Sequence, residues 1–143
     1  MKAVLDTNVW VSGFLNPDGI PGQILDAVRD RRVSVVSSPR LWSELQRTLS
    51  YRRVRTPLEQ DGLWDDVLSF LVAQPDVIFV HEVEPTSSWV PNDRDDDWVI
   101  QCALTANAEY IISGDRHLLS LGEVGPVRIL SPADFVAEVL DQE

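Results

Sequence analysis

Short apolar segments alternate along the chain with longer segments in which apolar residues recur every three or four positions. The short segments are typical of strands and lie at 2–6, 33–36, 77–80, 110–113 and 127–130. The longer segments predict helices at 9–15, 20–31, 39–50, 57–73, 94–107 and 132–140, with 52–56 as a link and 81–91 as an irregular stretch. Alternating strands and helices are typical of a parallel sheet covered on both faces. We therefore expect an α/β fold, a three-layer α/β/α sandwich around a mainly parallel sheet of about five strands.

Turn and capping signals support these boundaries. The segment Asn16-Pro17-Asp18-Gly19 is a strong turn signal after the first helix. Ser38-Pro39 and Ser131-Pro132 each combine a capping serine with a proline in the first helical turn, which marks a helix start. Because no repeat or linker-like segment divides the chain, we expect residues 1–143 to form one domain.

Length and composition are those of a folded chain outside a membrane. With 143 residues, of which 44% are hydrophobic, the chain can bury a core of ordinary size. No apolar run approaches the roughly 20 residues that span a bilayer. The single cysteine, Cys102, excludes an internal disulfide and fits a reducing compartment, so we expect a cytoplasmic location.

The net charge of -11 argues, taken alone, against a protein that binds nucleic acid. The charge is unevenly distributed, however, because most of the twelve basic residues lie between Arg29 and Arg55. A local arginine patch can hold a polyanion when bound metal ions offset an acidic centre. The alternative is that these arginines only solvate helix faces, and the sequence leaves both readings open.

Two predicted strands are followed by an aspartate, Asp6 after the first and Asp115 after the segment at 110–113. The carboxyl ends of parallel strands lie at one edge of a sheet, so these two acids can converge in one crevice. Each aspartate could instead cap the helix that follows it.

A further candidate, Asp97, lies at the start of the helix predicted at 94–107. It has Ile100 at i+3 and Leu104 at i+7, which places it on the apolar stripe that faces the sheet. The helix dipole alone explains the neighbouring acids of the first turn. Two of them could still assist as ligands, namely Asp93 and Asp96.

Glu44 is the fourth candidate and flanks the apolar stripe of the helix at 39–50, where a solvated glutamate is the alternative. Convergent carboxylates repel one another unless a cation lies between them. Oxygen ligands favour Mg²⁺ or Mn²⁺ over zinc, which prefers histidine and cysteine.

Four motifs carry a resemblance to a known family. They are LDTNV at 5–9, SPRLWSEL at 38–45, DRDDD at 93–97 followed by IQCAL at 100–104, and AEYIISGDRHLL at 108–119. In this order, over residues 2 to 137, they resemble the PIN domain, a family of metal-dependent ribonucleases. The resemblance is closest to the VapC-like toxins of toxin–antitoxin systems.

The resemblance implies hydrolysis of RNA phosphodiester bonds with Mg²⁺ or Mn²⁺, leaving a 5′-phosphate and a 3′-hydroxyl. It places the acidic, metal-binding and catalytic centre on Asp6, Glu44, Asp97 and Asp115, with Asn8 and Ser113 as supporting polar residues. It also implies an RNA substrate, a homodimer and an antitoxin protein as partner.

The arginine-rich stretch at 47–55 is our candidate for contacts with the RNA backbone, through Arg47, Arg52, Arg53 and Arg55. Trp98 stands where relatives often carry lysine or another polar residue. Its ring could stack on a nucleobase or pack within the protein.

Two other enzyme classes and one non-catalytic class share parts of this pattern. Phosphoryl-accepting receivers and haloacid-dehalogenase-type phosphatases also carry an aspartate after the first strand, but both need a lysine after a later strand. Lys2 is the single lysine and lies on the first strand, which excludes both. A non-catalytic module that binds metal, RNA or protein stays open as the alternative.

Overall fold

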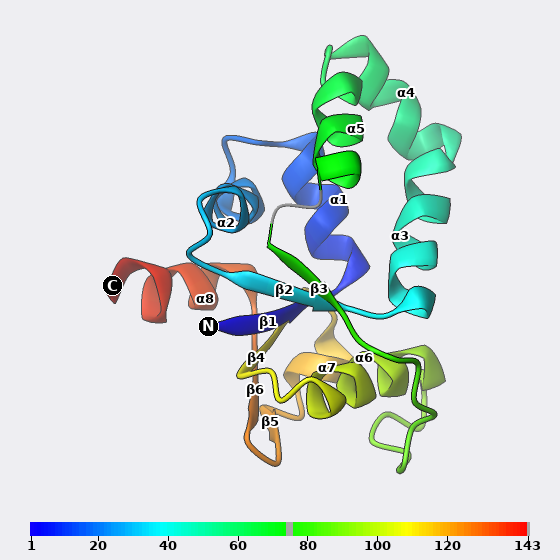
Figure 1. The fold of residues 1–143 in the computed structure, drawn as a ribbon, viewed down its shortest axis with the longest axis vertical. Helices are drawn as coiled ribbons and strands as arrows, with labels where there is room; N and C mark the ends of the chain where they lie inside the picture. Colours follow the sequence, from blue (N-terminus) through cyan, green and yellow to red (C-terminus); the bar gives the residue numbers. More distant parts are fainter. Residues whose placement is uncertain (74–75, 143) are drawn as a thin grey trace.

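The computed structural model describes residues 1–73 and 76–142, and within these ranges six strands form one mixed sheet (Figure 1). Their order is β3-β2-β1-β4-β6-β5, with β1 (Lys2–Leu5), β2 (Ser34–Ser37), β3 (Val77–Phe79), β4 (Tyr110–Ile112), β5 (Glu123–Val124) and β6 (Val127–Leu130). Neighbouring strands are parallel except β5 and β6, which form an antiparallel hairpin. The expected α/β fold with a mainly parallel sheet is confirmed. The sequence pattern does not predict β5, because two residues are too few to show an alternation.

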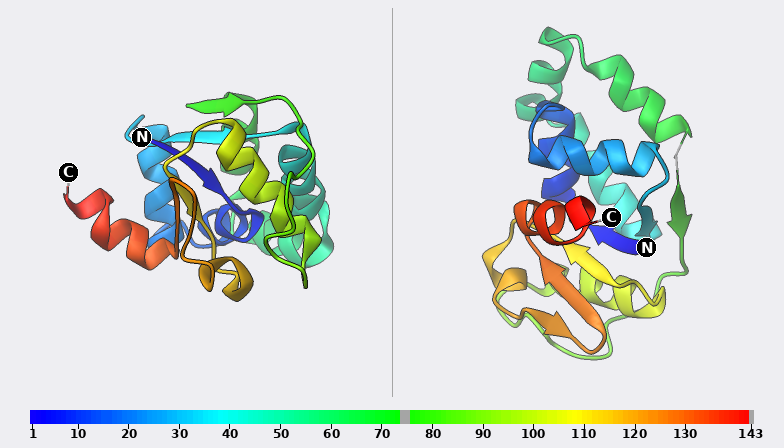
Figure 2. Two further views of the ribbon diagram at one scale, coloured as in Figure 1. Left: turned by 90° about the horizontal axis from the view of Figure 1, so that it is seen from below. Right: turned by 90° about the vertical axis from the view of Figure 1, so that its left-hand side faces the viewer.

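Helices cover both faces of this sheet (Figures 1 and 2). They are α1 (Thr7–Leu15), α2 (Ile20–Arg29), α3 (Pro39–Ser50), α4 (Arg52–Gln60), α5 (Trp64–Ala73), α6 (Arg94–Thr105), α7 (Arg116–Leu119) and α8 (Pro132–Glu138), followed by a 3₁₀ turn at Leu140–Gln142. Side-chain alternation along β1 divides the core. Ala3 and Leu5 pack with α1 to α5 and α8, whereas Val4 packs on the opposite face with α6 and α7.

The segment 52–73 differs from the prediction of a link followed by one long helix. The structure has two helices here, and α4 already begins at Arg52. Val54 and Leu58, one helical turn apart, are buried among the side chains of α1 and α3, so tertiary packing extends the helix across Pro57. Gly62 then adopts a φ of 71°, which L side chains rarely take, and the chain turns into α5. The other predicted elements agree with the structure to within two residues at each end.

In the part of the chain that the structure describes, no helix is long and apolar enough to cross a bilayer.

The two leucines at 58 and 68 give a matched test of this helical layer. Leu58 is fully buried, whereas Leu68 on α5 is 42% exposed. We expect Leu58→Ala to lower the free energy of unfolding by about 2–5 kcal/mol through lost apolar contacts and a residual cavity. Leu68→Ala should change it by less than about 0.5 kcal/mol. Urea denaturation of both variants measures the difference, and similar losses in the two would contradict the packing described for α4.

Candidate functional site

An acidic pocket of about 240 Å³ is lined by residues that follow the ends of β1 and β4 and by residues at the start of α6. Six carboxylates line it together with three other side chains. The lining residues are Asp6, Thr7, Asn8, Glu44, Asp93, Asp95, Asp96, Val99 and Asp115. Three of the four acids expected from the sequence are therefore together in one pocket: Asp6, Glu44 and Asp115.

Asp6 is fixed by hydrogen bonds from both strand ends. Its Oδ1 accepts the Thr7 N–H (2.9 Å), and its Oδ2 accepts the Ser113 hydroxyl (2.7 Å) and the Asn8 side-chain amide (3.2 Å). Burial raises the pKa of Asp6, and the charges of Asp115 and Asp93 raise it further, while the bonds from Ser113 and Thr7 lower it. The carboxylate thus caps α1 and also lines the pocket, so the two readings of Asp6 are compatible.

Asn8 and Ser113 connect the β1 end to the segment after β4. Asn8 Oδ1 accepts the Gly114 N–H (3.1 Å), and Ser113 Oγ accepts the Asp115 N–H (2.9 Å). Asp115 Oδ1 in turn accepts the His117 N–H (2.7 Å), which caps α7. Both polar residues named from the sequence therefore position the aspartates, and Ser113 does so while fully buried.

Asp93, Asp96 and Asp115 form the tightest part of the pocket, because one carboxylate oxygen of each lies within 4.8 Å of the other two. Asp96 is 6% exposed, and its Oδ2 has no hydrogen-bond partner among the described residues. Burial raises the pKa of Asp96 to about 7, with further contributions from Asp115 and Asp6. A buried oxygen without a partner, next to like charges, indicates a place for a cation.

Glu44 reaches the pocket from α3, which begins after the neighbouring strand β2. Burial raises the pKa of Glu44, and the charges of Asp6 and Asp95 raise it further. A hydrogen bond with Thr7 and the charge of Arg47 act in the opposite direction. Glu44 is therefore part of the acidic pocket, and the alternative of a merely solvated glutamate does not fit this environment.

The structure does not bring Asp97 into this pocket. Its Oδ1 accepts the Val90 N–H (2.8 Å), and its side chain faces the irregular segment before α6. Successive helical residues are rotated by about 100°, so only one of the two neighbouring aspartates can point toward the strand ends. Asp96 occupies the place expected for Asp97. The sequence signal for it was equally good, because Ile100 and Ala103 follow Asp96 at i+4 and i+7.

The four arginines named as RNA contacts are separated by the structure. Arg47 lines a polar pocket beside the acidic one, together with Glu44. The other three lie on α4, which follows the end of α3 that is remote from the sheet (Figure 1). Arg53 lies over Tyr51 (5.5 Å from guanidinium carbon to ring centroid), and Arg55 pairs with Glu59 (2.6 Å).

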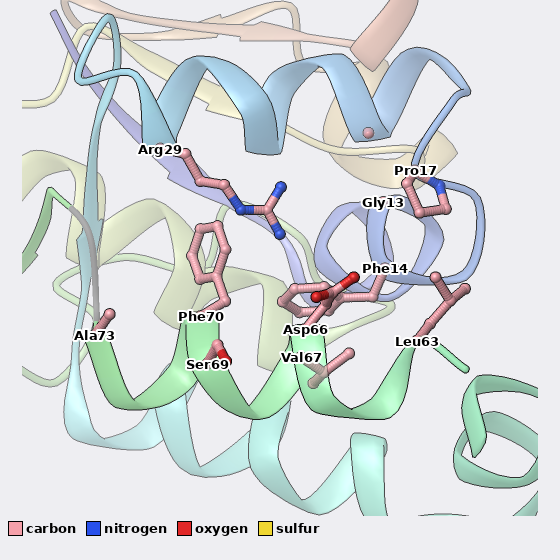
Figure 3. Close-up of a pocket in the computed structure, with 11 residues that line it drawn as sticks. Gly13, Phe14, Pro17, Arg29, Leu63, Asp66, Val67, Ser69, Phe70 and Ala73 are labelled. Atoms are coloured by element: carbon pink, nitrogen blue, oxygen red, sulfur yellow. The ribbon is translucent and has the colours of Figure 1, made fainter. Parts of the chain in front are cut away.

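A larger cavity of about 390 Å³ lies between α1, α2 and α5 (Figure 3). Phe14, Phe70 and Val67 contribute apolar surface, and the Arg29 guanidinium lies over the Phe70 ring at 4.8 Å. Among the described residues that line this cavity, Asp66 is the only acid. The cavity therefore lacks the convergent carboxylates of the acidic pocket and is not our candidate for metal chemistry.

The donor set of the acidic pocket fits a hard divalent cation. Asp93, Asp96 and Asp115 offer carboxylate oxygens at short mutual distances, and Asp6 lies beside them. Oxygen-only sites suit Mg²⁺ or Mn²⁺. Burial is the main cause of the raised pKa values of Asp6 and Asp96, and a divalent ion there would offset the repulsion from neighbouring carboxylates that adds to it.

The raised pKa of Asp96 predicts a pH-dependent cost in stability when no metal is present. The pKa of Asp96 is about 7 in the folded chain and near the ordinary value of 3.8 in the unfolded chain. Between pH 3.8 and pH 7 the folded state therefore binds more protons than the unfolded state. Stability therefore falls as the pH rises from about 4 to 7, and the cost stays above pH 7. We expect Asp96→Asn to be more stable than the wild type by roughly 1–3 kcal/mol at pH 8 in EDTA, with a much smaller difference at pH 5.

Urea denaturation at the two pH values measures this difference. Asp18→Asn, a change of an exposed acid outside the pocket, is the matched control and should match the wild type at both. An Asp96→Asn variant that gains nothing at pH 8 would show that Asp96 is not strained when ionised.

Comparison with known proteins identifies the family of the chain. The sequence profile of the family described as PIN domain matches residues 2–117, a range that includes every residue of the acidic pocket. The chain is also 30% identical, over 147 aligned positions, to an uncharacterized protein of Methanocaldococcus jannaschii, with 96% of this chain and 91% of that protein covered. No solved structure is a significant match. The chain belongs to the PIN domain family.

Proposed function

We propose that this protein is an endoribonuclease that hydrolyses RNA phosphodiester bonds with Mg²⁺ or Mn²⁺. The observation that carries the proposal is the convergence of Asp93, Asp96 and Asp115, with a buried Asp96 oxygen that has no partner among the described residues. PIN domains are in general metal-dependent nucleases, which supports the same reading. The acids proposed for the site are Asp6, Glu44, Asp93, Asp96 and Asp115, with Asn8 and Ser113 as supporting residues.

The residues of the chain have distinct roles in this proposal. A divalent ion, when bound, polarises the phosphate and lowers the pKa of the attacking water. Asp93, Asp96 and Asp115 would hold it, and the bonds from Ser113 and Asn8 fix the orientation of the Asp6 carboxylate in the same pocket. Glu44 lines the pocket from α3 and would orient the attacking water through a hydrogen bond.

The biological setting is a finer proposal. The resemblance to VapC-like toxins supports a role as the toxin of a toxin–antitoxin pair, acting as a homodimer in the cytoplasm and inhibited by an antitoxin protein. The net charge of -11 suits a partner segment that carries basic residues, which would be attracted to the acidic pocket.

Neighbouring aspartates of α6 provide the sharpest test of the site. We expect Asp96→Asn to reduce the rate of RNA cleavage at least about 100-fold, because it removes a carboxylate from the proposed metal site. Asp97→Asn should keep the rate within about threefold, because an asparagine oxygen can still accept the Val90 N–H. The measurement is cleavage of a mixed RNA pool by the purified variants with Mg²⁺ or Mn²⁺.

Asp6→Asn and an excess of EDTA serve as controls and should both abolish cleavage. Loss of activity in Asp97→Asn but not in Asp96→Asn would contradict the assignment of the site. A folded wild-type protein that binds Mn²⁺ without cutting any RNA would favour the non-catalytic binding module instead.

A further inference from the structure

A second polar pocket, of about 230 Å³, adjoins the acidic pocket along α3. It is lined by Arg40, Leu41, Ser43, Glu44, Arg47 and Asp95. Glu44 and Asp95 line both pockets, so the two form one continuous polar surface. The acidic part is the candidate metal centre, and the adjoining part carries two arginines.

These arginines share one face of α3 with Glu44. Arg40 lies four residues before Glu44 and Arg47 three residues after it, which are the spacings of neighbours on a helix surface. Arg47 lies close enough to lower the pKa of Glu44. Both guanidinium groups are therefore presented beside the acids of the pocket without being buried among them.

Arg40 makes two contacts, and a ligand can replace the weaker of them, the ion pair with Asp95. Its guanidinium lies over the Trp98 ring, 4.3 Å from the centroid, and contacts the exposed Asp95 carboxylate at 3.2 Å. An exposed pair of this kind contributes about 0–1 kcal/mol, so a phosphate can compete with Asp95 for the same donors. The Trp98 ring keeps the Arg40 guanidinium oriented while its N–H donors exchange Asp95 for a phosphate.

The charge of the acidic pocket makes such a site necessary for a polyanionic substrate. Six carboxylates line the pocket, and a bound divalent ion offsets only part of their charge. An RNA strand that crosses the pocket also carries phosphates on either side of the bond to be cleaved. Arginines at the rim lower the electrostatic cost for the neighbouring phosphate, and their fork of donors suits phosphate oxygens.

We propose that Arg40 and Arg47 form a phosphate-binding subsite that takes the backbone phosphate next to the bond that is cleaved. This inference rests on the proposed ribonuclease function for its substrate. It assigns binding of the RNA backbone to the face of α3 that carries Glu44. To Arg47, which the sequence already suggested, it adds Arg40 and the Trp98 ring that supports Arg40. It excludes Arg52 and Arg53, which line a separate surface with Tyr51.

The test is the affinity of the intact protein for a fluorescein-labelled single-stranded RNA of mixed sequence, measured by anisotropy with Ca²⁺ in place of Mg²⁺. We expect Arg40→Ala and Arg47→Ala each to weaken binding about tenfold. Each should also reduce the slope of log affinity against log salt by about 0.7, the value for one lost phosphate contact on a single strand. Arg40→Lys should lose less, because the positive charge remains. Arg52→Ala and Arg53→Ala carry the same charge change on α4 and should match the wild type.

Cleavage by the same proteins with Mg²⁺ separates this inference from the ribonuclease proposal. Arginine-dependent binding by a wild-type protein that cuts nothing would support the subsite and overturn the nuclease. Cleavage with unchanged KM and salt slope in both α3 variants would overturn the subsite and support the nuclease. Equal losses in the α3 and α4 variants, or a wild type that binds no RNA, would also overturn the subsite.

Discussion

Repulsion among carboxylates at the carboxyl ends of β1 and β4 is the constraint on which the acidic pocket depends. Asp93, Asp96 and Asp115 come within 4.8 Å of one another, and Asp96 keeps a buried oxygen without a partner among the described residues. Such an arrangement destabilises the folded chain unless protons or a cation compensate. The acids stay close together because the rest of the fold fixes the backbone position of each acidic residue. Burial is the largest cause of the rise in the pKa of Asp96 to about 7, and repulsion from Asp115 and Asp6 adds to it; a divalent ion would offset that repulsion.

The parallel sheet supplies that fixed backbone. Asp6 follows directly on β1, and its own N–H donates to Ile112 O (3.0 Å) on the neighbouring strand β4. Ser113 then bonds both the Asp6 carboxylate and the Asp115 N–H, so one buried hydroxyl sets the relative position of two acids. Because both faces of the sheet are packed, this junction cannot relax without disturbing two apolar clusters. The same polar contacts that cap α1 and α7 therefore keep the pocket in shape.

Most of the fold could be predicted from the sequence, because strand and helix periods are local properties. The positions of Asp6 and Asp115 could also be predicted, since residues that follow parallel strands lie together at the carboxyl edge of the sheet. Asp96 and Asp97 could not be separated in this way. Both begin an apolar stripe, and only the rotation of α6 against the sheet decides that Asp96 faces the strand ends while Asp97 bonds the Val90 N–H. The start of α4 was missed for a related reason, because burial of Val54 and Leu58 against other helices outweighs the local signal of Pro57.

The arginines show how far proximity along the sequence differs from proximity in the fold. Arg47 and Arg52 are five residues apart, but the chain changes direction at Tyr51, whose extended backbone ends α3 and begins α4. Arg40 and Arg47 are seven residues apart, which is about two helical turns, and they therefore return to the same face. Two arginines on this face, beside the acidic centre, can offset part of the repulsion that a polyanion would meet there. The overall charge of -11 thus says little about nucleic-acid binding, since the distribution of charge around Glu44 decides what the pocket can hold.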